Sequence, residues 1–471
     1  MHNAALAQRR STAGTSSSLY SRRQVLGAGT MAGMPLSWAH LFASRCAAAS
    51  NPAARPTGFG CARQMIMLFL HGGHPQQETF DPKPEGPSAV RGEFSAIHTR
   101  IPGISVSEVL PRTAQIMDRL AVIRSMTHDN PNHVQACLPA QTGHRHPDRF
   151  RGRGDFPPSA TDFPPFGAVC NATQPRSNSL PNWVRIGPLM RRSNGTVLHG
   201  QTPGLLGPAH ASFAVDQSLL PKDVTVQAIQ PGAELTLNRL GGRKTLLQQL
   251  DIQQADLVSS SPAQDLEIHY QRAFDLLSST RTRAAFDLQA EHTATRTRYG
   301  NTEFGQRCLL ARRLAQAGVP VVNVSYCHTP RGSWDTHGGN FTKMRDSLGP
   351  TFDTAFTALV ADLEQRGMLD DTLVVVNAEF GRTPAINKNA GRDHWPWVYS
   401  LALAGAGIRN GCVFGASDAS AAYPESHPRT PEDFAATLYH LLGVDPQTKI
   451  YDVLDRPHNL VTGRVITELL A

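Results

Sequence analysis

The sequence has no long uninterrupted run of apolar residues. After position 49, no stretch contains 18 consecutive apolar side chains, which is about the length that a membrane-spanning helix needs. The chain also has no Cys-x-x-Cys pair. We therefore expect no stable membrane span in the mature protein and no closely spaced thiol motif.

The net positive charge is small once the first 49 residues are set aside. The formal net charge is +7, but residues 1–49 carry five arginines and no acidic side chain, which leaves +2 for the remainder. A balance this small gives no support to nucleic-acid binding. We expect no nucleic-acid partner.

The cysteines leave two alternatives open. In an oxidising compartment the six that follow position 49 could form up to three disulfides, with 15 pairings to choose from. Buried free thiols are the alternative, because a chain of 471 residues builds a core that needs no cross-links. The six are Cys61, Cys137, Cys170, Cys308, Cys327 and Cys412.

The first 49 residues have the pattern of an export signal. Arg22 and Arg23 precede a weakly apolar stretch that is interrupted by glycines and Pro35, and three alanines end at Ala49. This order predicts a twin-arginine signal peptide over residues 1–49, followed by a linker over residues 50–62. An uncleaved anchor or a disordered tail is the alternative. The predicted location is periplasmic or extracellular.

Residues 63–471 are predicted to form a single domain, in which residues 147–232 are a loop-rich insertion. Apolar runs of strand length alternate with segments of helical periodicity, a pattern that favours an α/β fold with parallel strands and right-handed crossovers. The predicted strands are 65–70, 120–124, 319–326, 373–377 and 398–404. The predicted helices are 106–117, 246–250, 270–277, 304–317, 344–366 and 434–442.

Polar side chains gather where predicted strands end. Glu379 follows the strand over 373–377, Asp335 and His337 follow the strand over 319–326, and His394 lies in the next loop. Carboxylates and imidazoles together suit Zn²⁺, Mn²⁺ or a similar divalent ion. The alternative is that Asp335 and His337 cap a helix or turn while Glu379 pairs with Arg382.

Two further segments carry candidate groups. The strand over 65–70 ends at His71-Gly72-Gly73-His74, with Glu78 and Asp81 shortly after it. This is a familiar beginning for a metallohydrolase and also an ordinary strand end. Histidines cluster farther along, although a lone member of such a group is more often a surface residue. They are His128, His133, His144 and His146.

Several motifs, in this order, resemble the DUF1501 family over residues 60–470. The motifs are GG (72–73), FDPKP (80–84), RGEF (91–94), RSMTH (124–128), RYG to FG (298–305), ARRL (311–314), WDTHG (334–338), EFGRTP (379–384), GRDHW (391–395) and LLG (441–443). The family's members are exported and related to the sulfatase and alkaline-phosphatase superfamily. The resemblance implies an alkaline-phosphatase-like α/β/α sandwich with a mostly parallel central sheet.

The resemblance also implies a divalent metal, with Zn, Mn, Mg and Ca all open. Asp335, His337 and His394 match ligand positions, and Glu379 matches an acidic ligand. Glu78 stands where relatives have aspartate, and Phe380 stands where a histidine ligand is expected.

The nucleophile departs from the superfamily's patterns. Pro75 replaces the serine that many family members carry, and the Cys-x-Pro-x-Arg motif of sulfatases is incomplete at Cys137. These absences exclude the usual formylglycine mechanism. His133 falls at the nucleophile position at the start of a helix, where it could bind metal, attack phosphorus or act as a base; a solvent-exposed histidine is the alternative.

Two functions remain in competition. The first is an exported metal-dependent hydrolase of phosphate or sulfate esters, in which water or His133 replaces the absent nucleophile and Arg382 or Arg392 holds the substrate anion. Its substrate would be an anionic ester or polysaccharide. The second is a non-catalytic descendant that binds a polysaccharide, a lipid or a partner protein.

Overall fold

The computed structural model describes residues 56–150, 152–176, 179–220, 226–229, 276–327 and 333–471. Within it, Thr57–Ala471 form one compact unit. The predicted signal segment over 1–49, the predicted helix over 246–250 and most of that over 270–277 lie outside the described residues.

A central sheet of eight strands has the order β12-β4-β11-β8-β1-β7-β5-β6. Neighbouring strands pair in parallel except at β11, which is antiparallel to both β4 and β8. The predicted α/β class with a mostly parallel sheet is therefore confirmed. The strands are β1 (Gln64–Phe69), β4 (Leu120–Met126), β5 (Trp183–Ile186), β6 (Phe213–Val215), β7 (Val321–Ser325), β8 (Thr372–Asn377), β11 (Tyr399–Ala404) and β12 (Cys412–Phe414).

Both faces of the sheet are buried, which explains the continuous apolar runs in the sequence. In β1, Ile66 and Leu68 belong to one hydrophobic core, whereas Met65 and Met67 belong to a second core on the opposite face. Successive side chains of a strand point to opposite faces, so one apolar run supplies both cores.

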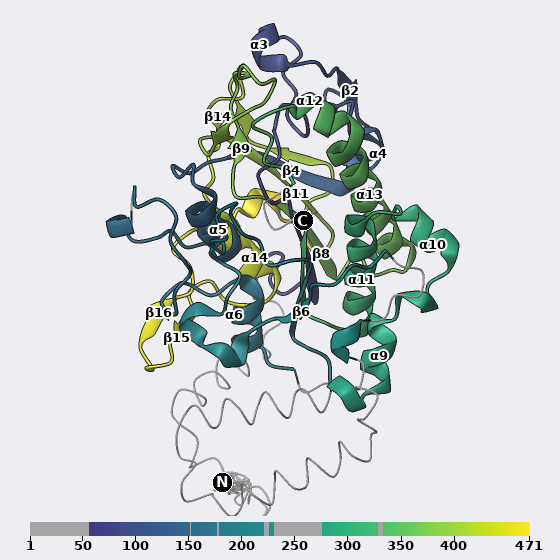
Figure 1. Ribbon diagram of the computed structural model, residues 1–471, viewed down its shortest axis with the longest axis vertical. Helices are drawn as coiled ribbons and strands as arrows, with labels where there is room; N and C mark the ends of the chain where they lie inside the picture. The colour runs from purple at the N-terminus through teal and green to yellow at the C-terminus, as the bar shows by residue number, and fades with distance from the viewer. Residues whose placement is uncertain (1–55, 151, 177–178, 221–225, 230–275, 328–332) are drawn as a thin grey trace, which may run out of the picture. The chain divides into compact units, whose positions relative to one another are not determined.

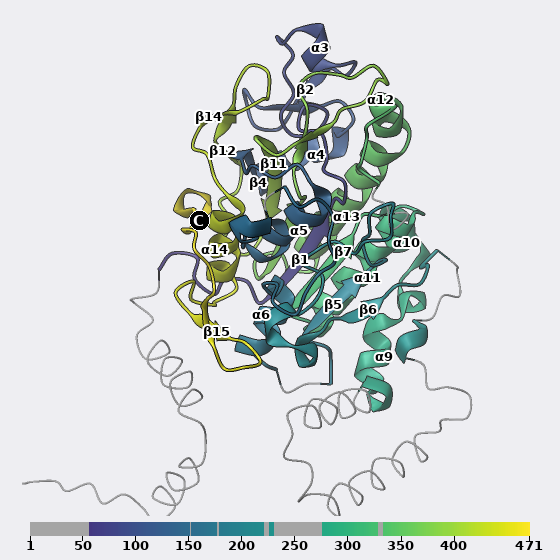
Figure 2. The same ribbon diagram turned by 60° about the vertical axis from the view of Figure 1, so that its left-hand side comes forward.

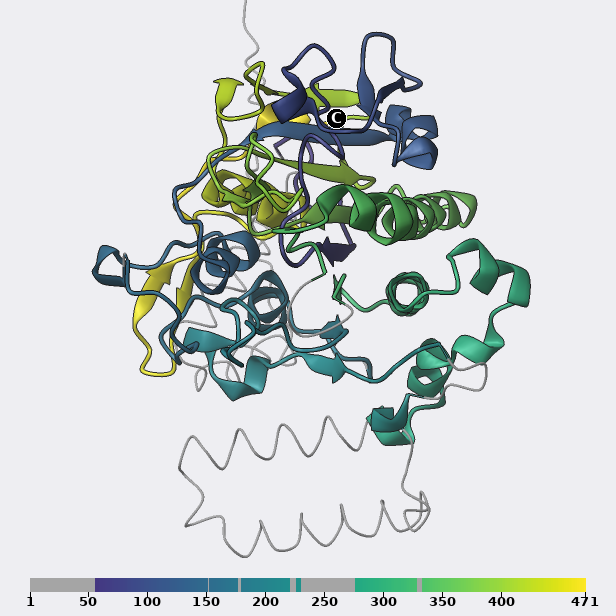
Figure 3. The same ribbon diagram turned by 45° about the horizontal axis from the view of Figure 1, so that its top comes forward.

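Helices cover each face, and Figure 1 shows α11 and α13 on one side with α5, α6 and α14 on the other. The turned views in Figures 2 and 3 keep this separation. α11 and α13 contribute to one core, α6 and α14 contribute to the other, and α5 packs in a third, smaller cluster with Phe69 of β1. The predicted α/β/α sandwich is therefore confirmed. The longer helices are α5 (His133–Thr142), α6 (Phe166–Thr173), α11 (Glu303–Ala317), α13 (Gly349–Gln365) and α14 (Pro431–Leu441).

Local sequence explains where α11 begins and ends. Thr302 caps its first turn by accepting a hydrogen bond from the Gly305 N–H, at 3.1 Å. Gly318 follows its last turn in the left-handed conformation, with φ of 104°. The helix predicted over 304–317 is therefore confirmed to within one residue.

The remaining elements are short. The shorter helices are α3 (Ser88–Arg91), α4 (Pro111–Gln115), α9 (Thr280–Phe286), α10 (Thr293–Arg298) and α12 (Asn340–Lys343), and a π-helical turn over Met344–Leu348 joins α12 to α13. Four small two-stranded ribbons are β2 (Ala96–His98) with β3 (Ser105–Ser107), β9 (Gly381–Arg382) with β10 (His394–Trp395), β13 (Ala416–Ser417) with β14 (Pro424–Ser426), and β15 (Lys449–Tyr451) with β16 (Pro457–Asn459).

Two local predictions differ from the structure. The helix predicted over 106–117 is wrong at its start, because Val106 pairs with Ile97 in a ribbon and the helix begins only at Pro111. The segment 147–232, predicted as loops, also supplies α6 and the two strands β5 and β6 of the central sheet. These strands are only three and four residues long, too short for an alternating pattern to reveal them.

The six cysteines after position 49 are all free thiols, and four of them are buried. The free-thiol alternative therefore describes the structure. Among the described residues, no helix combines the length and the apolar character that crossing a membrane would require.

Candidate metal centre

Three strands that run in the same direction deliver polar residues to one edge of the sheet. β7 leads to Asp335, β8 ends two residues before Glu379, and β4 leads to His133, the first residue of α5. His394 lies in the small ribbon β9–β10 at the same edge. The carboxyl ends of parallel strands are where α/β sheets place ligand sites.

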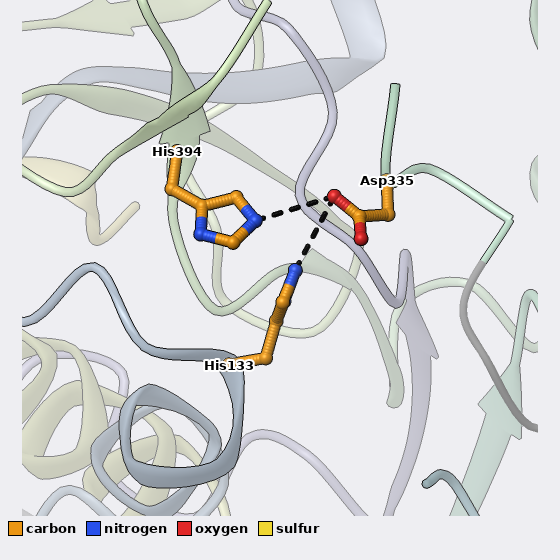
Figure 4. Close-up of side chains that lie close together, drawn as sticks. All are labelled: His133, Asp335 and His394. Carbon is orange, nitrogen blue, oxygen red and sulfur yellow. Dashed lines mark hydrogen bonds and ion pairs between the residues drawn. The ribbon is translucent and has the colours of Figure 1, made fainter. Parts of the chain in front are cut away.

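His133, Asp335 and His394 form a compact cluster (Figure 4). Each offers one ligand atom, and these atoms lie within 4.8 Å of one another. Asp335 Oδ1 is 3.4 Å from His133 Nε2 and 3.2 Å from His394 Nε2. His133 is buried, whereas the other two are half-buried.

His337 completes the group from its more exposed side. Its Nε2 lies 3.1 Å from Asp335 Oδ1 and 2.9 Å from His394 Nε2. The structure thus brings Asp335, His337 and His394 together, within the separation expected for ligands of one ion, and adds His133 to them.

Each of the three imidazoles is oriented through its other nitrogen. Nδ1 of His133 is 2.6 Å from Glu379 Oε1, and Nδ1 of His394 is 2.7 Å from the Pro131 carbonyl oxygen. Nδ1 of His337 is 2.6 Å from Asp393 Oδ1. Because these oxygens accept the Nδ1 proton, each ring turns its Nε2 toward Asp335, an arrangement typical of metal-ligating histidines.

The local electrostatics keep the carboxylates ionised. Burial alone would raise the pKa of Asp335, but the three surrounding imidazoles hold it well below its ordinary value. Burial likewise opposes ionisation of Glu379, yet contact with His133 lowers its pKa below the usual range. Burial lowers the pKa of His394 to about 4, whereas contact with Asp335 raises that of His337.

Glu379 is held in place from two sides. The Gly72 N–H donates to Glu379 Oε1 at 2.8 Å, and His128 Nε2 lies 2.7 Å from the Glu379 carbonyl oxygen. Among the described residues, Glu379 Oε2 has no hydrogen-bond partner although it is buried. Glu379 therefore contacts the cluster through His133 Nδ1 and is not one of the grouped ligand atoms, so the predicted ligand Glu379 supports a ligand instead.

Gly72 is required by the close approach of two loops. Its φ of 114° is a conformation that favours glycine, and an added Cβ would lie 2.3 Å from the Asp335 nitrogen. The adjacent His71 carbonyl accepts from the Trp334 N–H at 3.0 Å. The loop after β1 thus packs directly on the segment that carries Asp335.

Phe380 occupies the position where the family resemblance implies a histidine. Its ring is buried, and its centroid lies 4.7 Å from the rings of both His133 and His394. A phenyl ring offers no ligand atom, so Phe380 supports the two imidazoles by packing alone.

Arg382 is buried and its donors are engaged by the protein. Nε donates to the Gly73 carbonyl at 3.0 Å, and Nη2 donates to Asp335 Oδ1 at 2.9 Å. Further donors reach the carbonyls of Gly72, Trp334 and Arg392. Arg382 positions Asp335, whereas the sequence suggested that it would hold a substrate anion.

Glu78 and Arg392 form a separate buried pair. Arg392 Nε and Nη2 contact both oxygens of Glu78 at 2.6–3.1 Å, and neither side chain is exposed. Other Arg392 donors reach the carbonyls of Val90, Thr383 and Pro384. The structure brings neither residue into the cluster of His133, Asp335 and His394, so the expected ligand Glu78 and the expected anion-binding Arg392 stabilise each other instead.

The sequence did not reveal the roles of three supporting residues. Asp393 orients His337, His128 holds the main chain of Glu379, and Asn132 caps α5 by accepting from the Gln135 N–H at 3.2 Å. Asp393 and Asn132 each stand directly before a candidate histidine, which was the available signal. No local pattern pointed to the contact between His128 and Glu379, because 251 positions separate them.

The donor set fits a divalent ion. Three Nε2 atoms and a carboxylate oxygen converge, and imidazole with carboxylate is a ligand set suited to Zn²⁺ and similar ions. His133, Asp335 and His394 would hold the ion, with His337 next to them.

Several solved structures can be superposed on most of this chain at low sequence identity. They include the PsFucS1 sulfatase from Pseudoalteromonas sp. (14% identity, TM-score 0.40, 87% of this chain and 72% of that one) and the phosphonate monoester hydrolase of Agrobacterium radiobacter (12%, 0.38, 87% and 77%). A protein in the alkaline phosphatase superfamily from Vibrio parahaemolyticus also matches (12%, 0.36, 89% and 75%). The α/β fold is evident from the central sheet and its covering helices, independently of these low similarities.

No curated protein matches this sequence. A family model does match, and it covers nearly all of the described unit. Its description is "Protein of unknown function (DUF1501)", and it matches residues 62–470. The chain therefore belongs to the DUF1501 family, as its motifs suggested.

Proposed function

We propose that this protein is an exported metal-dependent hydrolase of phosphate or sulfate esters that does not use formylglycine. The observation that carries the proposal is the convergence of three imidazole Nε2 atoms on Asp335 Oδ1, at 3.1–3.4 Å. Each imidazole has an acceptor at its Nδ1, so each presents a lone pair to the centre. Only a cation or added protons can satisfy such a set of acceptors.

A bound divalent ion would polarise an ester oxygen and make water a stronger acid. The side chains supply the rest of the chemistry. Glu379 keeps the Nδ1 proton of His133 in place, so that His133 Nε2 faces the centre as a ligand or a base. Arg382 holds the ionised carboxylate of Asp335 in place through the hydrogen bond from its Nη2 to Oδ1.

The substrate class follows from the surroundings of His133. His133 opens α5, and the N-terminus of a helix of this length favours an anion. A cavity of about 360 Å³ adjoins this end of the helix and is lined by Pro131, Asn132 and Arg145, among others. We infer that the substrate is an anionic ester whose charged group lies toward the start of α5.

The test compares esterase activity with and without metal. Purified protein is stripped with a chelator, reloaded with Zn²⁺ or Mn²⁺, and assayed with 4-nitrophenyl phosphate and 4-nitrophenyl sulfate. We expect activity only in reloaded protein and a loss of at least about 100-fold in His133→Ala. The exposed His98 provides the matched control, His98→Ala, which should retain full activity.

A non-catalytic binding protein is the second candidate. Two arginines favour it, because Arg382 and Arg392 donate their hydrogen bonds to other groups of the protein and not to a substrate anion. This candidate predicts metal-loaded protein that hydrolyses neither ester yet binds an anionic polysaccharide. Activity in the reloaded wild type would rule it out.

Export through the twin-arginine route is part of the proposal. Arg22 and Arg23 precede the weakly apolar segment that such signals contain. Replacing both with lysine should leave the precursor in the cytoplasm, as measured by cell fractionation. Unchanged export of the double variant would exclude this route.

A further inference from the structure

A second group of metal-ligating side chains lies outside the centre described above. His146, Asp162 and His199 each present one ligand atom, and these atoms lie within 4.8 Å of one another. His146 follows α5, Asp162 precedes α6, and His199 lies between β5 and β6. Three separate loops thus bring two imidazoles and one carboxylate together.

His199 is oriented as a metal ligand would be. It is fully buried, and its Nε2 lies 3.0 Å from the Phe156 carbonyl oxygen, which accepts the ring proton. Its Nδ1 faces Asp162 Oδ2 at 2.5 Å. A backbone carbonyl on the distal nitrogen is the usual arrangement around a ligating histidine, because it directs the other lone pair at the ion.

Hydrogen bonds hold both the main chain and the carboxylate of Asp162. Its carbonyl accepts from the Leu205 N–H at 3.0 Å, and the Ser159 N–H donates to Oδ2 at 3.2 Å. A Cβ at Gly204 would lie 2.0 Å from the Asp162 oxygen, so this close approach depends on glycine. The carboxylate is therefore held in place before any ion arrives.

His146 is the member of the group with an unsatisfied ring nitrogen. Within the part of the chain that the structure describes, its buried Nε2 has no hydrogen-bond partner. Its ring stands nearly perpendicular to that of His199, at 4.5 Å between centroids, and the Phe156 ring lies against it at 5.2 Å. His146 also lines the cavity next to α5, which provides an entry path.

An ion pair between Asp162 and a protonated His199 would account for their short contact. It would not account for His146, whose nitrogen stays unsatisfied inside the same group. Ligands of a tetrahedral ion with bonds of about 2.0–2.2 Å lie roughly 3.3–3.6 Å apart. An ion would therefore take the place of the shared proton and widen the contact by about 1 Å.

We propose that His146, Asp162 and His199 bind a divalent transition-metal ion of the zinc class. Two imidazoles and one carboxylate leave a fourth position open, as in sites that keep a water or a ligand on the metal. Of the three ligands, His146 lines the cavity that Asn132 also lines at the start of α5. The ion would tie together the three loops that carry His146, Asp162 and His199.

The test counts zinc in variants that separate the two sites. Wild-type protein and His394→Ala, each with and without His146→Ala, are equilibrated with zinc sulfate and desalted, and zinc per chain is measured by mass spectrometry. We expect His146→Ala to carry one zinc fewer than its parent in both backgrounds, with at least 100-fold weaker binding at this site by calorimetry. Equal zinc in His394→Ala and in the double variant would overturn the proposal.

The design keeps this proposal apart from the first centre. A missing first centre would appear as equal zinc in the wild type and in His394→Ala, which is a different comparison. The surface variant His98→Ala should bind zinc like its parent. If His146→Ala does not fold, as judged by circular dichroism, His146→Gln replaces it, and the Co²⁺ absorption bands of His394→Ala protein provide a second readout; absence of such bands would also overturn the proposal.

Discussion

The role of a polar residue in this protein depends on which groups its side-chain nitrogens and oxygens contact. His133 and Arg392 follow equally polar segments in the sequence, yet one faces the cluster and the other is buried against Glu78. The difference lies in the second contact that each group makes. His133 has Glu379 on its far nitrogen, whereas every nitrogen of Arg392 donates to the protein itself.

The pair of Glu78 and Arg392 yields the first residue-scale prediction. Burial raises the pKa of Glu78, and Arg392 opposes this. We expect Glu78→Gln and Arg392→Gln each to lower the free energy of unfolding by about 3–5 kcal/mol, because each leaves a buried charge alone. The double variant should lose less than the sum of the two, as measured by chemical denaturation.

The same variants test whether Glu78 is a ligand. If it only stabilises Arg392, folded Glu78→Gln protein should bind as much zinc as the wild type. A loss of zinc in folded protein would return Glu78 to the metal centre.

Gly72 provides the second residue-scale prediction. Gly72→Ala should lose stability from its φ of 114° and also from the clash with the Asp335 nitrogen. The matched control is Gly195→Ala, which has φ of 88° and no atom within 4 Å of the added Cβ. Backbone strain alone costs about 1–3 kcal/mol, so the excess loss in Gly72→Ala measures the loop contact. Equal losses in the two variants would contradict the close packing.

Among the helices and strands, the sequence pattern predicted those whose ends and burial are determined by residues close together in the chain. The helix over 304–317 has a cap and a terminal glycine in its own sequence, and the strands at 65–70 and 373–377 are built on the apolar runs 65–70 and 373–376. Asp335, His337 and His394 could be proposed because they follow such strands. Pairs formed across the chain could not be read in this way: 314 positions separate Arg392 from Glu78.

The N-terminus of α5 carries the element-scale prediction. Asn132 caps this helix through the Gln135 N–H, and Asp155 Oδ1 holds the Asn132 side chain at 2.8 Å. Asn132→Ala should lower the free energy of unfolding by about 1 kcal/mol, whereas Asn132→Ser, another good cap, should lose much less. Thermal unfolding of the two variants distinguishes them, and equal losses would mean that the cap contributes nothing.

For the whole molecule, buried histidines predict how stability depends on pH. Burial lowers the pKa of both His74 and His128 to about 4, against 6.5 in the unfolded chain. Between these values the unfolded state binds protons that the folded state does not, so stability falls as pH drops from about 6.5 to 4. Each histidine contributes a loss of up to about 3 kcal/mol.

His128→Gln tests this dependence, because it keeps a donor for Glu379 and removes a titrating group. Its free energy of unfolding should fall less steeply between pH 6.5 and 4 than that of the wild type, as measured by urea denaturation at several pH values. The exposed His98→Ala should leave the slope unchanged. An unchanged slope in His128→Gln would show that this group titrates normally in the folded protein.

The metal centre can be tested directly by an anomalous difference map, recorded at the zinc absorption edge, from crystals grown with zinc. We predict a peak bounded by His133 Nε2, Asp335 Oδ1 and His394 Nε2, which already lie close together in the structure. Bonds of about 2.0–2.2 Å to these atoms would identify them as ligands. A zinc-saturated crystal with no peak among these three atoms would show that they do not bind a metal ion.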